Sequence, residues 1–497
     1  VYGYDAYDDN GNNNFNEKRE WILGAFIHSR PSVIHYSDRS VIYAGGNDGM
    51  LHAFDDETGE ELWGFIPPDL LNKLQALHQD VLESFVDGSP KAYITHNVDG
   101  SIYQAILIIS ERRGGNHYYA LDVTNPLAPQ YIWKIGPEIT GFSELGQTWS
   151  TPNIGKVTIG TEDKYVAFIG GGYDENQDND PLTTSDTKGR AIYIVDVLNG
   201  SLIKRFSVSD TGYSGMTYSI PSDIAKVDTD GNEKIDRLYV GDMGGRMWRF
   251  DIGNSNTANW TGKMIFNSNP GRDGTTGRKI FYPPDVTLEK DVTNYEMLFF
   301  GTGDREHPKE ATVINRLYAV KDKNPSTALT EQENDLLVDI TQDLLQDPST
   351  SQEDKNAILE QLRTGNGWFI KLDSTIGEKS LSPPVVFNKI AYFTTFSPTS
   401  EGASGDPCYV GEGTARVYIL EYNTGSAMFN LDLTNDVGGT VVSKNDRSKI
   451  IGTAIPSGVV ITFIGGKPIA YIGVGGGVSM PPITGRQNEQ KYWKMVF

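Results

Sequence analysis

The chain has 497 residues, with 43 Lys or Arg against 65 Asp or Glu, so its formal net charge at pH 7 is −22. Such an acidic surface repels phosphate backbones, which excludes nucleic acid as an expected partner. Hydrophobic residues make up 38% and charged residues 22% of the sequence, which is typical of a soluble globular protein with a large core.

Two classes of architecture are excluded at once. The one cysteine, Cys408, excludes internal disulfide bonds and every metal site built from several cysteines. The longest apolar run, 105–109, has the length of a strand and is far shorter than the ~20 residues of a membrane-spanning helix, so we expect no membrane insertion.

The chain starts at Val1 and shows no leader with basic residues followed by an apolar stretch. We therefore expect a fragment or mature form.

Strand–turn–strand units recur along the whole chain. Residues 41–65 contain an apolar strand, a Gly-Gly-Asn-Asp-Gly turn, a second strand, a Glu-Thr-Gly turn and a third strand with Trp63. The pattern recurs at 116–135, 165–206, 236–252, 297–322 and 415–429, and a last Gly-rich strand spans 470–478. Repeated units of this kind are typical of a β-propeller. Six or seven units predict an all-β fold of that class, while unrelated β-hairpins remain the alternative.

The longest interruption of the repeats is residues 323–366. Apolar residues recur at three- and four-residue spacing in 336–346 and 352–363, which predicts two helices. Ser351 precedes a Gln-Glu-Asp stretch and is a suitable N-cap. We expect a helical insertion that decorates one propeller domain covering 1–497, not a separate domain.

One loop has the composition of a cation site. Asp228, Asp230, Asn232 and Asp236 place side-chain oxygens at positions 1, 3, 5 and 9, and the Lys234 carbonyl would supply another oxygen. Calcium accepts several oxygens from a flexible loop and fits better than magnesium. The loop departs from an EF-hand, because Glu233 replaces the sixth-position Gly and Tyr239 the twelfth-position Glu. A solvated acidic turn is the alternative.

Two further segments alternate oxygen donors less completely. In the first the donors are Asp8, Asn10, Asn12 and Asn16. In the second they are Asp174, Asn176, Asp178 and Asp180. Each is a possible second or third cation site, but an Asn-rich turn and a solvated insertion loop explain the same residues.

Catalytic motifs are absent from the sequence. None of the seven His forms a His-x-x-x-His pair, and there is no Gly-x-Ser-x-Gly elbow or P-loop. We interpret His28, His52 and His117 as blade histidines held by their neighbours. Because these motifs are absent, we expect a protein that is not an enzyme. The sequence still leaves open a pair of catalytic carboxylates of the glycosidase kind.

Six segments, spread over nearly the whole chain, match one known family in the same order. They are 21–33, 43–63, 168–174, 221–251, 300–308 and 381–398. On these segments the chain resembles the C-terminal propeller of the PilY/PilC family of type IV pilus biogenesis factors and tip adhesins.

This resemblance implies a modified seven-bladed propeller with quinoprotein-like blades and a Ca²⁺ site at the 228–236 loop. It also implies a longer parent protein with an N-terminal region outside this chain. The implied role is pilus assembly and regulation, in which the calcium-bound state opposes retraction, together with surface adhesion, twitching motility and virulence. The implied partners are pilins or minor pilins and host or abiotic surfaces, and the implied location is the pilus tip on the bacterial surface, after export through the periplasm and outer membrane.

The sequence also departs from the family pattern. It contains no Arg-Gly-Asp, since 271–274 reads Gly-Arg-Asp-Gly, so an integrin-type contact is not carried over. Two alternatives stay open. One is a quinoprotein-type enzyme that uses pyrroloquinoline quinone, although some of those enzymes place a vicinal cysteine pair against the quinone and this chain has one Cys. The other is a metal-free scaffold propeller for protein binding.

Overall fold

The structure is a computed structural model. It describes residues 4–5, 8, 10–18, 23–78, 83–179, 185–270, 277–290, 294–332, 335–398, 413–432, 434 and 442–483. Seven β-sheets follow one another along this part of the chain. Asp180, Cys408 and the segment 271–274 lie outside the described residues.

The first four sheets are antiparallel and each contains four strands in chain order. The first contains β1 (Ser32–His35), β2 (Ser40–Gly45), β3 (Leu51–Asp55) and β4 (Glu61–Phe65). The second contains β5 (Lys91–His96), β6 (Ile102–Ser110), β7 (Tyr118–Asp122) and β8 (Gln130–Ile135). The third contains β9 (Asn153–Ile159), β10 (Glu162–Gly170), β11 (Ala191–Asp196) and β12 (Leu202–Ser207). The fourth contains β13 (Ala225–Val227), β14 (Arg237–Gly241), β15 (Arg246–Asp251) and β16 (Thr261–Asn267).

The last three sheets are less regular. The fifth contains β17 (Asp285–Lys290), β18 (Asn294–Gly301), β19 (Arg316–Asp322), β21 (Gly367–Lys371) and, at its edge, β20 (Leu337–Asp339). The sixth contains β22 (Lys379–Ser380), β23 (Val385–Phe387), β24 (Ile390–Ser397), β25 (Thr414–Glu421) and β26 (Ser448–Gly452). The seventh contains β27 (Val460–Ile464), β28 (Lys467–Val474) and β29 (Gly477–Ser479). Described 3₁₀ helices are η1 (Pro68–His78), η2 (Glu175–Asp178), η3 (Thr257–Asn259) and η6 (Lys444–Arg447).

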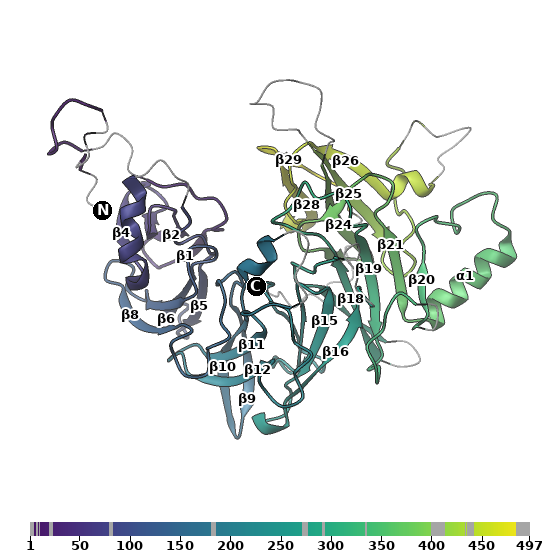
Figure 1. The fold of residues 1–497 in the computed structure, drawn as a ribbon, viewed down its shortest axis with the longest axis horizontal. Coiled ribbons are helices and arrows are strands. Elements are labelled where there is room, and N and C mark those ends of the chain that lie inside the picture. Colours follow the sequence, from purple (N-terminus) through teal and green to yellow (C-terminus); the bar gives the residue numbers. More distant parts are fainter. Residues whose placement is uncertain are drawn as a thin grey trace.

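The sheets succeed one another around an arc, from the purple first sheet to the yellow last one (Figure 1). The innermost strands of neighbouring sheets contact one another, as in the pairs β1 with β5, β9 with β13 and β13 with β17. The fold is therefore a seven-bladed β-propeller, as the resemblance implied. In the described residues no helix is long and apolar enough to span a membrane.

The core lies between the blades. Six clusters of buried apolar side chains each join two consecutive sheets. Alternation along β6 shows how one strand serves two of them: Ile106 and Ile108 pack toward the third sheet, while Ala105, Leu107 and Ile109 pack toward the first. Because successive side chains of a strand point to opposite faces, a strand buried on both faces reads as the continuous apolar run seen in the sequence.

Tryptophans on outer strands bind the neighbouring blade. The indole N–H of Trp63 donates to the Pro126 carbonyl at 2.7 Å, and that of Trp133 donates to the Val197 carbonyl at 2.9 Å. Each acceptor lies in the turn that follows the third strand of the next sheet. A third bond of this kind joins Trp368 to Tyr422 at 2.9 Å. These bonds give buried indoles the partner they require and fix how adjacent blades meet.

The insertion at 323–366 is only half helical. Helix α1 (Gln352–Thr364) is confirmed, and Ser351 caps it by accepting a hydrogen bond from the Asp354 amide at 3.0 Å. The helix predicted at 336–346 is wrong, because β20 runs parallel to β21 there and is followed by turns. Leu337 and Ile340 are buried in the blade core, so pairing with the open sheet edge outweighs the local helical spacing.

Candidate metal centre

The loop 228–236 joins the two inner strands of the fourth blade, β13 and β14. Ile235 anchors the loop, since its side chain belongs to the apolar cluster between the third and fourth blades and its N–H donates to the Lys156 carbonyl at 2.9 Å. Gly155 leaves the space for it, because a Cβ there would lie 2.7 Å from Ile235 Cγ1. The end of the loop is therefore fixed to the propeller while its tip is exposed.

Three carboxylates converge within this loop. Asp228, Asp230 and Asp236 each offer an oxygen, and these oxygens lie within 4.8 Å of one another. Two unit charges at that separation repel by on the order of 1–4 kcal/mol for an effective dielectric constant between about 80 and 20. A divalent cation bound by all three would replace this repulsion with attraction, so the geometry suits a hard cation with oxygen ligands.

Backbone amides hold two of the carboxylates in place. Asp228 Oδ1 accepts hydrogen bonds from the N–H groups of Gly231 at 2.6 Å and Asn232 at 3.1 Å, and its Oδ2 accepts one from Glu233 at 2.7 Å. Asp236 Oδ2 accepts from the Thr229 N–H at 2.7 Å and from the Thr229 hydroxyl at 2.8 Å. The chain thus curls around the carboxylates, and these bonds occupy Asp228 Oδ1 and Asp236 Oδ2 more fully than the other oxygen of each carboxylate.

The remaining predicted ligands lie beside this group. Asn232 Nδ2 donates to Asp230 Oδ2 at 3.0 Å, and its Oδ1 accepts the Lys234 N–H at 2.8 Å. The Lys234 ammonium pairs with Asp163 of the third blade at 2.8 Å. Ligation by Asn232 Oδ1 and by the Lys234 carbonyl stays a prediction.

Glu233, which replaces the sixth-position glycine, adopts the left-handed backbone conformation that glycine usually provides. Glu233 adopts φ = +70°, and Gly231 adopts φ = +81°. A left-handed conformation costs a residue with a side chain about 1–2 kcal/mol, so the loop keeps the sharp turn at an energetic cost. Tyr239, at the twelfth position, is buried in β14, and its hydroxyl donates to Asp322 at 2.6 Å.

A shallow pocket of about 350 Å³ opens beside the loop. Its lining combines the metal-loop residues Asn232 and Asp236 with the 252–255 turn that follows β15. Gly253 makes this close approach possible, because a Cβ there would lie 2.7 Å from Asp236 Oδ1. A change in the loop would therefore alter the shape of this pocket.

The Asn side chains of the segment near the start point toward Glu17, which was not among the predicted ligands. The side-chain amides of Asn10 and Asn12 both donate to Glu17 Oε1 at 2.6 Å, and Asp8 Oδ1 accepts the Asn13 N–H at 2.9 Å. Sequence reasoning missed Glu17, which supplies the charged group toward which the Asn side chains point. A cation at Asp8, Asn10, Asn12 and Asn16 stays a prediction.

The 174–180 segment uses its carboxylates in protein contacts. Asp174 accepts hydrogen bonds from the N–H groups of Asn176, Thr187 and Lys188. Asp178 forms a two-pronged ion pair with a guanidinium, that of Arg113, with both N···O distances 2.9 Å. These contacts leave fewer oxygens for a cation than the sequence suggested, and a third metal site here stays a prediction.

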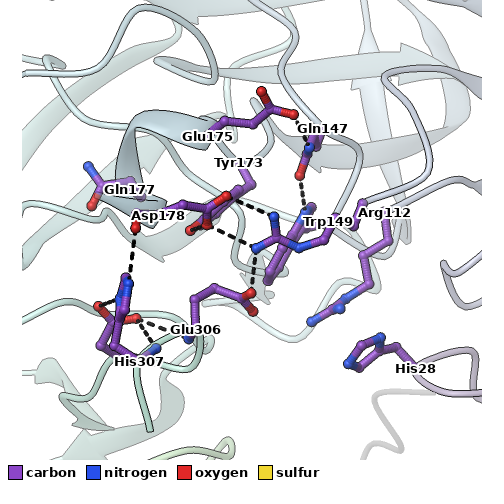
Figure 2. A network of polar contacts seen from close by, with 12 residues as sticks. His28, Arg112, Gln147, Trp149, Tyr173, Glu175, Gln177, Asp178, Glu306 and His307 are labelled. Carbon is purple, nitrogen blue, oxygen red and sulfur yellow. Dashed lines mark hydrogen bonds and ion pairs between the residues drawn. The ribbon is translucent and has the colours of Figure 1, made fainter. Parts of the chain in front are cut away.

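Figure 2 shows Asp178 in a network of polar contacts. Arg113 of the second blade also contacts Glu306, which follows β18 of the fifth blade, and His307 Nε2 lies 3.1 Å from the Asp178 carbonyl. Burial favours a higher pKa for the Asp178 carboxyl, but hydrogen bonds from Arg113 and Tyr173 outweigh it and lower the pKa. The network therefore joins the second, third and fifth blades by charged contacts.

A second convergent group was not predicted from the sequence. Asp69, Glu111 and His117 also bring ligand atoms within 4.8 Å of one another. They come from η1 and from the two ends of the β6–β7 connection. Asp69 lies too far from the other two residues in the sequence for a spacing motif to connect them. The one local signal was that Glu111 and His117 flank the same turn.

Comparison with known proteins supports a pilus-related family. A family model described as the PilY1 beta-propeller domain matches residues 31–325. The type IV pilus biogenesis factor PilY1 of Pseudomonas aeruginosa strain UCBPP-PA14 is 24% identical over 88% of this chain and 43% of that protein. A PilY1 homolog of Xylella fastidiosa strain Temecula1 is 26% identical over 81% of this chain and 27% of that protein. The chain thus spans less than half the length of these curated relatives, which are named as biogenesis factors and not as enzymes.

A solved structure shows the same fold. The crystal structure of the Pseudomonas aeruginosa PilY1 C-terminal domain matches with a TM-score of 0.59 and 20% identity, covering 90% of this chain and 93% of that chain. A quinohemoprotein alcohol dehydrogenase from Comamonas testosteroni matches with a TM-score of 0.46 and 10% identity, over 92% of this chain and 72% of that chain. The latter likeness is too distant to carry an argument about activity.

Proposed function

The chain belongs to the PilY1 β-propeller family of type IV pilus biogenesis factors, and from that premise we propose that it is a calcium-responsive propeller that regulates the pilus. The observation that carries the proposal is the convergence of Asp228, Asp230 and Asp236 in one exposed loop. In the proposed role the calcium-bound state opposes pilus retraction and supports twitching motility and surface attachment. The contacts are proposed to be pilins or minor pilins and host or abiotic surfaces.

Calcium is the cation that the loop favours on chemical grounds. All candidate ligands are oxygens, from three carboxylates, one side-chain amide and one backbone carbonyl, and calcium accepts six to eight oxygens in a flexible arrangement. Magnesium requires near-ideal octahedral geometry and dehydrates reluctantly. Water molecules would complete the coordination at the exposed tip.

The loop acts in this proposal as an order–disorder switch. Without a cation the three carboxylates repel one another, and with calcium a single conformation is held. The cation can shift the loop only by its differential affinity for the ordered form. Ile235 keeps the loop attached to the core in both states, so the change is transmitted to the neighbouring pocket at 252–255 and not to the blade itself.

Pilus retraction in the parent bacterium tests this role. Asp236→Ala removes one carboxylate and is expected to weaken calcium binding and to shift the pilus population toward retraction. Asp230→Lys places an ammonium in the site and is expected to mimic the bound charge, which restores extended pili without calcium. Surface pilin, twitching zones and attachment would be measured together.

A matched control removes the same charge elsewhere. Asp99 lies in the corresponding inner turn of the second blade, where it accepts hydrogen bonds from Ser101 N and Oγ at 3.0 and 2.6 Å. Asp99→Ala is expected to leave retraction unchanged. If pili retracted equally in bacteria with the native protein and with a folded Asp236→Ala variant, the proposed calcium switch would be wrong. The chain would then be a metal-free scaffold propeller.

A further inference from the structure

A partly buried cluster of mixed ligands lies at the junction of the first two blades, away from the calcium loop. Asp69 is in the first turn of η1, which connects the first blade to the second. Glu111 directly follows β6, and His117 directly precedes β7. Imidazole and carboxylate together are the donors that zinc and related transition metals prefer.

The distances in this cluster suit a small cation. His117 Nδ1 lies 3.0 Å from Asp69 Oδ2 and 3.8 Å from Glu111 Oε2. Ligand atoms at about 2.0–2.1 Å from zinc in a tetrahedron are roughly 3.3 Å apart. The observed separations lie on either side of that value, so small shifts of the side chains would place all three donors around one zinc ion.

Unpartnered buried atoms point independently to a ligand. The Glu111 side chain is 0% exposed, and its Oε1 has no hydrogen-bond partner among the described residues. His117 Nδ1, buried beside it, also has no hydrogen bond of acceptable geometry in that part of the chain. A buried polar atom without a partner is costly, and a cation bound between Glu111 and His117 would satisfy both.

The surroundings match those of a metal-binding histidine. Glu138 Oε2 lies 3.0 Å from His117 Nε2, so a proton held on Nε2 would leave Nδ1 as the nitrogen that binds a metal. The Tyr119 hydroxyl donates to Asp69 Oδ1 and orients that carboxylate. A ligand side chain whose far atom is hydrogen-bonded to a carboxylate is the usual outer arrangement of such sites.

Two glycines provide the space around the cluster. A Cβ at Gly115 would lie 2.1 Å from Glu111 Oε2, and a Cβ at Gly136 would lie 2.2 Å from His117 Cδ2. Neither position therefore admits a side chain without displacing a proposed ligand. Asp69 is exposed at the surface, so a cation could enter from solvent on that side.

We propose that Asp69, Glu111 and His117 form a binding site for a divalent transition-metal cation, represented by Zn²⁺. Three protein ligands leave a fourth position for water or for a side chain of a partner. The bound cation would tie η1 to the β6–β7 connection and so fasten the first blade to the second. This site is separate from the 228–236 loop, and it does not depend on the proposed calcium switch.

Calorimetric titration of the untagged full chain with ZnCl₂, in saturating Ca²⁺, tests the proposal. One zinc site is expected, with affinity at least tenfold weaker in His117→Gln and in the nearly isosteric Glu111→Gln. Glu138→Gln keeps all three ligands and is expected to weaken binding about 10–100-fold, as outer-shell changes do. Co²⁺ in place of Zn²⁺ is expected to give the visible absorption of a low-coordinate site in the native chain and to lose it in His117→Gln.

His52 provides the matched control. It lies between two carboxylates as His117 does, but both of its nitrogens form hydrogen bonds, Nε2 with Asp48 Oδ1 at 3.0 Å and Nδ1 with Glu61 Oε1 at 2.7 Å. His117 Nδ1, by contrast, lies 3.0 Å from Asp69 Oδ2 without the geometry of a hydrogen bond. His52→Gln is expected to bind zinc like the native chain. Absence of zinc binding in the native chain, or binding unchanged in a folded His117→Gln, would overturn the proposal. Loss of zinc binding in Asp236→Ala alone would place the zinc in the calcium loop and overturn it too.

Discussion

Replacing Glu233 by glycine tests whether the 228–236 loop must adopt a strained turn to bind calcium. Glu233 has φ = +70°, and this conformation costs about 1–2 kcal/mol for a residue with a side chain. Glycine removes that cost but loses about 0.5–1 kcal/mol more conformational entropy when it becomes ordered. The net gain in the ordered loop therefore lies between about 0 and 1.5 kcal/mol, and its midpoint of about 0.75 kcal/mol corresponds to roughly three- to four-fold tighter binding.

The comparison with Glu233→Ala isolates the backbone effect. Both variants remove the same carboxylate, and both keep the backbone N–H that donates to Asp228 Oδ2, but alanine keeps the strain at positive φ. Calcium calorimetry on the two variants is expected to give the tighter affinity for glycine. Equal affinities would show that the turn is not strained in the calcium-bound loop, and the reasoning from its conformation would fail.

Three further predictions concern the propeller itself. Asp322→Ala removes a buried partner of the Arg249 guanidinium at 2.9 Å and the acceptor of the buried Tyr239 hydroxyl, while Asp251 still pairs with Arg249 at 2.8 Å. This change is expected to cost about 1–3 kcal/mol in urea unfolding; a loss below about 0.5 kcal/mol would contradict this. Trp133→Phe removes the N–H bound to the Val197 carbonyl and is expected to cost about 1–3 kcal/mol, whereas native-like unfolding would show that this bond does not hold the blades. Burial raises the pKa of Asp242 to about 6, so its stabilising contribution is full below about pH 4 and is lost as the pH rises through about 6. Asp242→Asn is therefore expected to flatten the fall in unfolding free energy between about pH 4 and 7, and an unchanged slope would refute the assignment.

The blade pattern was predictable because its signals are local. Apolar alternation and Gly-rich turns such as 41–65 determine which residues pair and which faces are buried. The structure confirms the propeller, and the matching family model confirms the family resemblance. The segment 336–346 shows the limit of such signals. Its apolar spacing fits a helix, but β21 presents an open edge far along the chain, and no local pattern records that edge.

The two convergent clusters differ in how far apart their residues lie in the sequence. Asp228, Asp230 and Asp236 are close in sequence, so their spacing indicated convergence, which the structure then showed. Asp69 and His117 meet only because η1 crosses the end of the second blade, and that crossing follows from tertiary packing. Whether either cluster binds a metal is a property of ligand geometry and affinity, which spacing alone does not give.

Calcium titration by calorimetry on the full chain, beside Asp236→Ala and Asp99→Ala, tests the central claim most directly. The account predicts one calcium site assigned to the 228–236 loop, lost in Asp236→Ala and retained in Asp99→Ala, with all three proteins folded. The absence of calcium binding in the native chain, or a site of unchanged affinity in Asp236→Ala, would contradict it.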